Sequence, residues 1–269
     1  LARQAVQRFA SRADLEAANC TIEEGEEYEP HIDAGEDDAA GVGYRAIAAG
    51  DVPMDDIVLW DGGNKDFAFL KPDLHIVVAD ALRPDQLRTH HPGETALPMA
   101  DIVVVNKIDA ENVDLEALLE RIQDAFGKEC LPLNLPAGKR SKVSDCFFAP
   151  SGEAAPDEVD FSSVEAAHRR LVDQVVEVDE KLMETYLEKG EVSPEEQHEP
   201  LERALREGHL IPVVFTSAKT GAGNAELLNV IVELLPNPTE GNPPSYFVSK
   251  SDGSTTDLQP VPDPGKHVL

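Results

Sequence analysis

The residues best suited to chemistry are Asn106, Lys107 and Asp109, which directly follow the apolar run 101–105. A short β-branched run predicts a buried strand, and open α/β sheets bind ligands at the carboxyl ends of their strands. The Asp109 carboxylate can accept hydrogen bonds from the ring N–H and the exocyclic amine of guanine together, which adenine cannot offer. The Asn106 amide can reach guanine N7 and O6, and the aliphatic stem of Lys107 can lie over the purine with its charge in solvent. A plain helix cap after a strand is the alternative interpretation of these four residues.

Asp61 is a second candidate, because it follows the predicted strand 56–60 and precedes Gly62 and Gly63. A carboxylate at this place can hold Mg²⁺ through water while the glycine backbone approaches a phosphate. A tight Asp-Gly turn explains the same residues without a ligand. The phosphate-loop pattern Gly-x-x-x-x-Gly-Lys-Ser/Thr does not occur in the 269 residues.

The composition argues against several partners. The chain has 52 Asp and Glu against 23 Lys and Arg, a net charge of -29. Direct DNA binding and binding to an anionic membrane both need clustered cations, so we expect neither, and we expect a solvated acidic surface instead. The three cysteines are odd in number and lack metal-ligand spacing, which predicts reduced thiols and a cytoplasmic location. The pair His90-His91 has no carboxylate at ligand spacing and is expected on the surface.

The elements that would position these residues alternate between strand and helix, which predicts an α/β fold. The chain is expected to carry strands near 56–60, 74–79, 101–105 and 211–215. Helices are expected at 1–19, 113–126, 163–189 and 224–235, with an acidic loop at 22–31.

The first part of the chain, about 1–109, resembles predicted GTPases related to cyclic 2,3-diphosphoglycerate synthetase. The resemblance rests on Cys20-Thr21-Ile22-Glu23-Glu24, Trp60-Asp61-Gly62-Gly63-Asn64-Lys65-Asp66 and His91-Pro92-Gly93-Glu94-Thr95. It implies a Gly-rich phosphate loop upstream of these motifs, and such a loop is not found in the sequence.

The rest, about 106–269, resembles the GTPase domain of elongation factor G, a family of protein biosynthesis. The resemblance rests on Asn106-Lys107-Ile108-Asp109, Val143-Ser144-Asp145-Cys146-Phe147-Phe148, Ser217-Ala218-Lys219 and Leu234-Leu235-Pro236-Asn237-Pro238. It implies that Ser217, Ala218 and Lys219 also bind guanine, with the Ala218 N–H donating to O6. It further implies GTP or GDP with Mg²⁺ as ligands, and an inserted subdomain that contacts the ribosomal stalk protein.

Together these resemblances predict a P-loop-GTPase-like three-layer α/β fold that lacks its first strand and phosphate loop. We expect an incomplete GTPase-like domain at 1–129 plus 209–236, an inserted α+β subdomain at 130–208, and a linker at 237–269 to a β-barrel domain. The two resemblances meet at the Asn-Lys-x-Asp motif, which suggests a chimera by natural fusion, misassembled reading frame or design.

The expected function is guanine-nucleotide binding of the elongation factor G type, with hydrolysis left open because the phosphate loop is absent. A nucleotide-dependent enzyme like cyclic 2,3-diphosphoglycerate synthetase is one alternative. A non-catalytic module that docks on the ribosomal stalk is the other.

Overall fold

A computed structural model describes residues 7–36, 38–40, 59, 72, 74–89, 96–148, 159–189, 200–205, 207–234, 246–249 and 255–258. The chain divides into two compact units, Leu1–Lys71 and Pro72–Leu269, which are described separately below.

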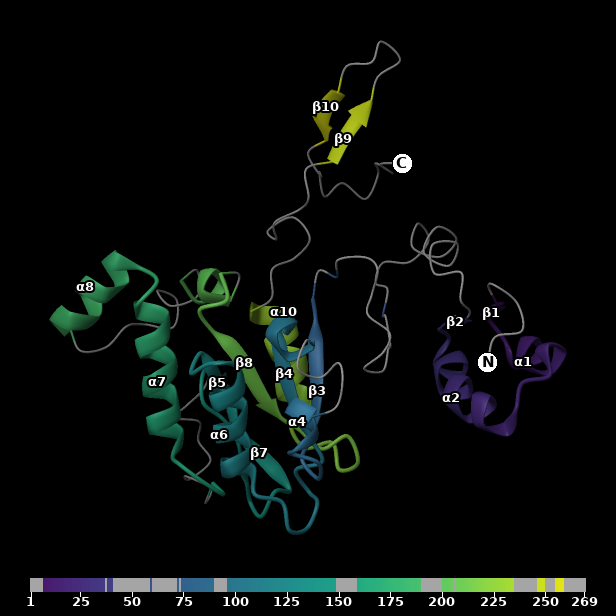
Figure 1. Ribbon diagram of the computed structural model, residues 1–269, viewed down its shortest axis with the longest axis horizontal. Helices are drawn as coiled ribbons and strands as arrows, with labels where there is room; N and C mark the ends of the chain where they lie inside the picture. The colour runs from purple at the N-terminus through teal and green to yellow at the C-terminus, as the bar shows by residue number, and fades with distance from the viewer. Residues whose placement is uncertain are drawn as a thin grey trace. The chain divides into compact units, whose positions relative to one another are not determined.

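The second unit is built on a four-stranded parallel sheet with the order β3-β4-β8-β5 (Figure 1). Its strands are β3 (Ile76–Asp80), β4 (Ile102–Asn106), β8 (Ile211–Phe215) and β5 (Cys130–Pro132). Three of the four predicted strands are therefore confirmed, whereas the predicted strand 56–60 lies outside the described residues except for Leu59.

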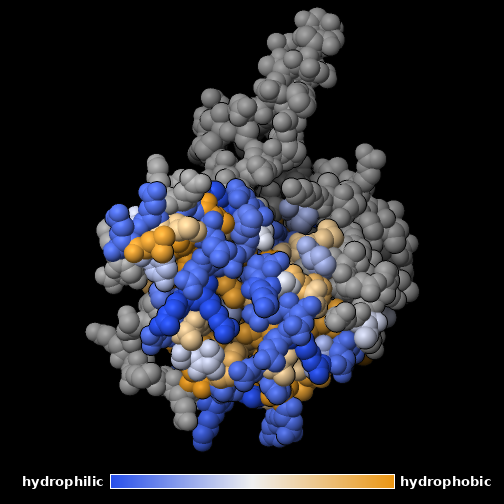
Figure 2. Space-filling model, turned by 60° about the vertical axis from the view of Figure 1, so that its left-hand side comes forward, coloured by the Kyte–Doolittle hydropathy of each residue, from blue (hydrophilic) through white to orange (hydrophobic). Residues whose placement is uncertain are grey.

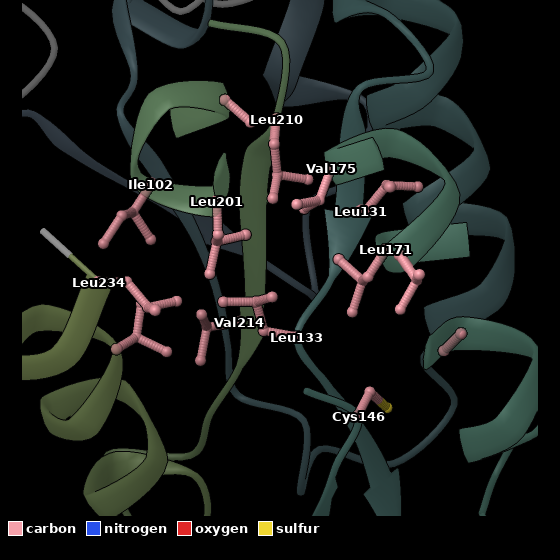
Figure 3. Close-up of a cluster of buried hydrophobic side chains, with 14 of the residues drawn as sticks. Ile102, Leu131, Leu133, Cys146, Leu171, Val175, Leu201, Leu210, Val214 and Leu234 are labelled. Atoms are coloured by element: carbon pink, nitrogen blue, oxygen red, sulfur yellow. The ribbon is translucent and has the colours of Figure 1, made fainter. Parts of the chain in front are cut away.

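The side chains of β4 alternate between two hydrophobic cores, as expected for a strand buried on both faces. Ile102 and Val104 belong to one core, which helices α7 (Val164–Val176) and α10 (Asn224–Leu234) complete (Figure 3). Val103 and Val105 belong to the other core, which helix α6 (Leu115–Phe126) covers. The sheet is therefore the middle of three layers, as predicted for a GTPase-like α/β fold.

The helices of this unit follow the apolar periodicity of the sequence only in part. They are α4 (Gln86–Thr89), α6 (Leu115–Phe126), α7 (Val164–Val176), α8 (Glu180–Lys189) and α10 (Asn224–Leu234), with a 3-10 turn η1 (Leu97–Met99) and a helical stretch at 200–205. The single long helix predicted at 163–189 is wrong. The Asp179 carboxylate accepts from the Leu182 N–H at 2.9 Å and so caps a new helix after α7 ends.

A hairpin follows the sheet strand β5. It pairs β6 (Asn134–Ala137) with β7 (Lys142–Asp145) in antiparallel register. Strand β5 belongs to the parallel sheet through its pairing with β8. The expected start of the insert at 130 stays a prediction. The remaining predicted domain boundaries stay predictions.

The first unit differs most from expectation. Helix α1 (Arg12–Ala18) begins later than predicted, after strand β1 (Gln7–Phe9), which pairs with β2 (Asp38–Ala40). The acidic stretch expected as a loop is helix α2 (Ile22–Ala34). Glutamate is a good helix former, and Arg12 offsets part of the acidic charge by pairing with Glu29 and Asp33.

The tail 237–269 contains an antiparallel pair of strands, β9 (Tyr246–Ser249) and β10 (Thr255–Leu258), and its role as a linker stays a prediction. Among the described residues the buried polar ones are Asn134, Thr216 and Ser217, so none of the described carboxylates is buried. Figure 2 shows hydrophilic side chains over much of the face that it presents. Within the described part of the chain, no helix combines the length and apolarity that crossing a membrane requires.

Candidate functional site

The candidate site lies where β4 and β8 end side by side. Both strands are parallel and in register, with Val105 opposite Phe215. The Thr216 N–H donates to the Val105 carbonyl at 2.8 Å, and the Ile108 N–H donates back to the Thr216 carbonyl at 3.2 Å. These bonds bring together two loops that are far apart in the sequence, one after β4 and one after β8.

The Asn106 side chain ties the two loops together. Its Oδ1 accepts from the Lys107 N–H at 2.7 Å and from the Ala218 N–H at 3.0 Å. Because the amide oxygen is used in this way, Nδ2 is the group that Asn106 can offer to a ligand acceptor. The resemblance implied that the Ala218 N–H donates to guanine O6. In the structure this N–H donates to Asn106, the acceptor within reach.

Asp109 and Ser217 form the second tie between the loops. The Ser217 hydroxyl donates to Asp109 Oδ1 at 2.6 Å, and Ser217 Oγ accepts from the Thr220 N–H at 3.2 Å. Ser217 is fully buried, so this carboxylate is fixed by a buried partner. Within the described part of the chain, Asp109 Oδ2 makes no hydrogen bond and is free to accept from a ligand.

Lys107 turns the chain sharply after β4. Its φ is 67°, a left-handed conformation that is uncommon for a residue with a side chain. Its ammonium group donates to Asp80 Oδ2 at 2.7 Å, so the charge expected in solvent is paired with a carboxylate while remaining half exposed. Burial raises the pKa of Asp80, but the hydrogen bonds from Lys107 and the Leu82 N–H and the charges of Lys107 and Arg83 outweigh it. The net pKa of Asp80 is therefore below its usual value.

The loops border a hollow of about 580 Å³. Its lining residues are Leu82, Asn106, Lys107, Asp109, Ala110, Glu111, Ala218 and Lys219. Five of the six predicted base-binding residues thus line one hollow. The sixth, Ser217, does not line it but donates a hydrogen bond to Asp109, which does. This volume is in the range of small-molecule sites.

Backbone packing under the second loop is tight at Gly223. The Ser217 N–H donates to the Ala222 carbonyl at 2.8 Å, which closes the loop after β8. Gly223 follows with a φ of 79°, and a Cβ there would lie 2.2 Å from the Phe215 carbonyl oxygen. Only glycine fits this place without a shift of the backbone.

The predicted metal residue Asp61 lies outside the described residues. Among those that are described, no group of three or more His, Cys, Asp or Glu side chains could hold a metal ion. The described residues therefore form no metal centre. The Asp109 carboxylate offers an acceptor that suits a planar base carrying N–H donors.

Comparison with known proteins identifies the family. The sequence profile of the "Elongation factor Tu GTP binding domain" matches residues 68–237, well over half of the chain. The chain belongs to this family. The matched range includes all the residues that line the hollow described above.

Several relatives are similar over parts of the chain. An "Elongation factor G-like protein" of Mycobacterium tuberculosis is 32% identical over 163 residues, covering 58% of this chain and 22% of the relative. "Elongation factor G" of Fervidobacterium nodosum is 29% identical over 174 residues, covering 60% and 25%. "Arginine synthetase ArcE" of Thermococcus kodakarensis is 52% identical over 114 residues, covering 42% and 25%. The chain thus spans about a quarter of the length of these relatives.

A crystal structure of a Thermus thermophilus protein is also similar, with 30% identity and a TM-score of 0.49, covering 62% of this chain and 27% of that one. The elongation factor G resemblance is confirmed at the level of the family. The arginine synthetase similarity is compatible with a second resemblance, whereas the chimera stays a prediction.

Asp80 lies beside the site but is not among the residues predicted from the sequence. It lies at the end of β3, and its carboxylate holds the Lys107 ammonium beside the hollow. The signal was present, because an acidic residue directly after a predicted parallel strand lies at the same edge of the sheet as Asn106.

Proposed function

We propose that this chain binds guanine nucleotide, GDP or GTP, with the base in the hollow between the loops after β4 and β8. The observation that supports this most is the Asp109 carboxylate. One of its oxygens is fixed by buried Ser217, and the other makes no hydrogen bond within the described part of the chain. A fixed carboxylate of this kind is suited to the paired N–H donors of guanine.

The same geometry discriminates against other bases. Adenine would present a lone pair where guanine presents its ring N–H, so the carboxylate would face an acceptor instead of a donor. Asn106 Nδ2 can donate to guanine N7 or O6, and Lys107 and Lys219 line the hollow with aliphatic stems. A wrong base would leave the Asp109 carboxylate or the Asn106 amide without a hydrogen-bond partner, and this cost would make the site selective for guanine.

The proposal covers binding of the elongation factor G type and leaves hydrolysis open. Catalysis of phosphoryl transfer depends on positioning and charge stabilisation around the phosphates, and the 269 residues contain no phosphate-loop pattern. Mg²⁺ would accompany the phosphates of a bound nucleotide, and Asp61 stays the predicted residue for it. The ribosomal stalk contact and the cytoplasmic location are carried forward as predictions with the function.

Titration of the full chain with fluorescent GDP, followed by competition with IDP, ADP and XDP, tests the proposal. IDP lacks the exocyclic amine, so we expect the affinity order GDP, IDP, ADP. Asp109→Asn replaces one carboxylate oxygen by an amide NH2 donor. It should lower the affinity for GDP by at least about tenfold, because a charged acceptor is lost, and raise the affinity for XDP, whose C2 oxygen can accept from the new donor.

The matched control is Asp124→Asn, which makes the same substitution at an exposed position on α6. It should leave all four affinities unchanged. Equal affinities of the wild-type chain for GDP, IDP and ADP would refute the assignment of the base site.

Neither alternative is favoured by a described contact. An enzyme like cyclic 2,3-diphosphoglycerate synthetase would need phosphate-binding residues, and the predicted ones near Asp61 lie outside the described residues. A stalk-docking module would use the surface around α7 and α8. Its only support is the similarity of the chain to elongation factor G and an elongation factor G-like protein.

A further inference from the structure

Arg140 connects the β6–β7 hairpin to the loop that follows Asp109. Its Nη2 donates to the Val113 carbonyl at 3.0 Å, and its Nη1 donates to the Ala110 carbonyl at 3.3 Å. Arg140 is 30 residues from Ala110 in the sequence, so these bonds are contacts between separate elements. One guanidinium group thus holds both ends of the segment 110–113.

Asp160 fixes the direction of this guanidinium group. Its Oδ2 accepts from Arg140 Nε at 2.5 Å, and the side chains of Arg140 and Asp160 are only 25% and 20% exposed. The Asp160 N–H donates to the Pro136 carbonyl at 2.9 Å, so Asp160 is itself anchored to β6. A charge-assisted hydrogen bond to a largely buried carboxylate leaves the rest of the planar guanidinium group in a fixed orientation.

The backbone around Arg140 has an unusual conformation. Gly138, Lys139 and Arg140 have φ values of 56°, 56° and 68°, so three successive residues are left-handed. Two of them carry side chains, and such conformations persist only where surrounding contacts enforce them. The turn between β6 and β7 thereby presents the Arg140 side chain to the neighbouring loop.

The segment held by Arg140 is a wall of the hollow. Ala110 and Glu111 line it, and Asn112 adopts a left-handed φ of 61°. The Ala110 N–H donates to the Lys107 carbonyl at 3.0 Å, which continues the turn that carries Asp109. A shift of this segment would therefore move the Asp109 carboxylate relative to the base.

We propose that Arg140, held by Asp160, is a positioning residue for the base site. It sets the place of Asp109 through the carbonyls of Ala110 and Val113 and couples the β6–β7 hairpin to base selectivity. The inference rests on the proposed function, because it assigns Arg140 a role in guanine recognition at that same hollow. Arg140 does not line the hollow and need not contact the ligand.

The test measures GDP and IDP affinity of the full chain in four variants. The difference between the two nucleotides is the exocyclic amine, so the GDP to IDP affinity ratio reports how well Asp109 is placed. Arg140→Ala should lower this ratio by about tenfold, the loss expected when one charge-assisted hydrogen bond is misplaced. Arg140→Lys keeps the charge and one donor and should restore part of the ratio.

Asp160→Asn is the third variant. It weakens the hydrogen bond that orients Arg140 but leaves the bonds from Arg140 to the segment 110–113 in place. The GDP to IDP affinity ratio should fall by about threefold. It decides the question if Arg140→Ala does not fold. Arg169→Ala is the matched control. Arg169 pairs with Glu165 on the exposed side of α7, at 2.8 Å, and its loss should leave the ratio unchanged.

Each outcome has one meaning. An unchanged ratio in the Arg140 and Asp160 variants overturns the inference and leaves the proposed function standing. Equal weakening of GDP and IDP also overturns it, because a merely structural role would lower both affinities together. A wild-type chain that does not distinguish GDP from ADP overturns the proposed function and the inference with it.

Discussion

Gly223 leaves no room for a methyl group beneath the loop after β8. A Cβ at this position would lie 2.2 Å from the Phe215 carbonyl oxygen, and the φ of 79° already disfavours a side chain. Gly223→Ala should therefore destabilise the chain by about 2–4 kcal/mol and weaken nucleotide binding, because Phe215 precedes the loop that carries Ser217.

Gly221→Ala is a matched control at a glycine with nearly the same φ angle. Its φ is 82°, but a Cβ there would meet nothing within 4 Å. The free energy of unfolding of this variant should fall by only about 1 kcal/mol, the conformational cost of placing a side chain at a left-handed φ. Chemical denaturation of both variants measures the difference, and equal losses would show that the steric contact at Gly223 is unimportant.

Residue types at the site were predictable, but their partners were not. The chemistry of Asn106 and Asp109 follows from their side chains and their place after a strand. The use of Asn106 Oδ1 by the Ala218 N–H depends on the spacing of two loops that are 112 residues apart in the sequence. The contacts of Arg140 were not predictable for the same reason, since they cross between elements. The place of Asp80 at the sheet edge could be predicted, but its bond to Lys107 could not.

One buried side chain, Asn134, joins β6 to β8. Asn134 Oδ1 accepts from the Phe215 N–H at 2.7 Å, and its Nδ2 donates to the Phe215 carbonyl at 3.2 Å. Asn134→Leu keeps the volume but leaves both backbone groups of Phe215 buried without a partner. We expect a loss of about 3 kcal/mol in the free energy of unfolding.

Urea denaturation measures this loss, and Asn229→Leu provides the comparison at an exposed position of α10. That substitution should change the stability by less than about 0.5 kcal/mol. A similar small change for Asn134→Leu would mean that water or a backbone shift satisfies Phe215.

Elements with strong periodicity were predictable, whereas those set by single polar contacts were not. The central strands and α6 follow from apolar patterns, since burial on both faces of the sheet determines them. Helix α2 was predicted as a loop, because its acidic residues show no apolar face until Arg12 and the Phe9–Tyr28 ring stack are in place. The break between α7 and α8 depends on capping by Asp179.

At the scale of the whole molecule, the two buried thiols, Cys130 and Cys146, report on opening of the second unit. Burial, with the charge of Glu129, raises the pKa of Cys130 to about 11, and burial, with the charge of Asp145, raises the pKa of Cys146 to about 12. Cys20 is partly exposed. Because a raised pKa leaves little thiolate at pH 8, we expect one fast-reacting thiol in the native chain and three after unfolding.

A thiol-labelling time course at pH 8, with and without denaturant, checks this expectation. Cys20→Ser should abolish the fast phase and leave two thiols that react only with unfolding. Rapid labelling of Cys130 or Cys146 in the native chain would show that the sheet opens more readily than its packing indicates.

The place of β8 in the sheet has a consequence for the order in which the chain folds. It lies between β4 and β5, although both precede it in the sequence. During chain synthesis the edges of β4 and β5 therefore stay unpaired until β8 has been made. Strand β8 must then pair with both of them, as the last strand of the sheet. The hydrogen bond from Ser217 to Asp109 then closes a span of 108 positions, so the hollow is completed only late in folding.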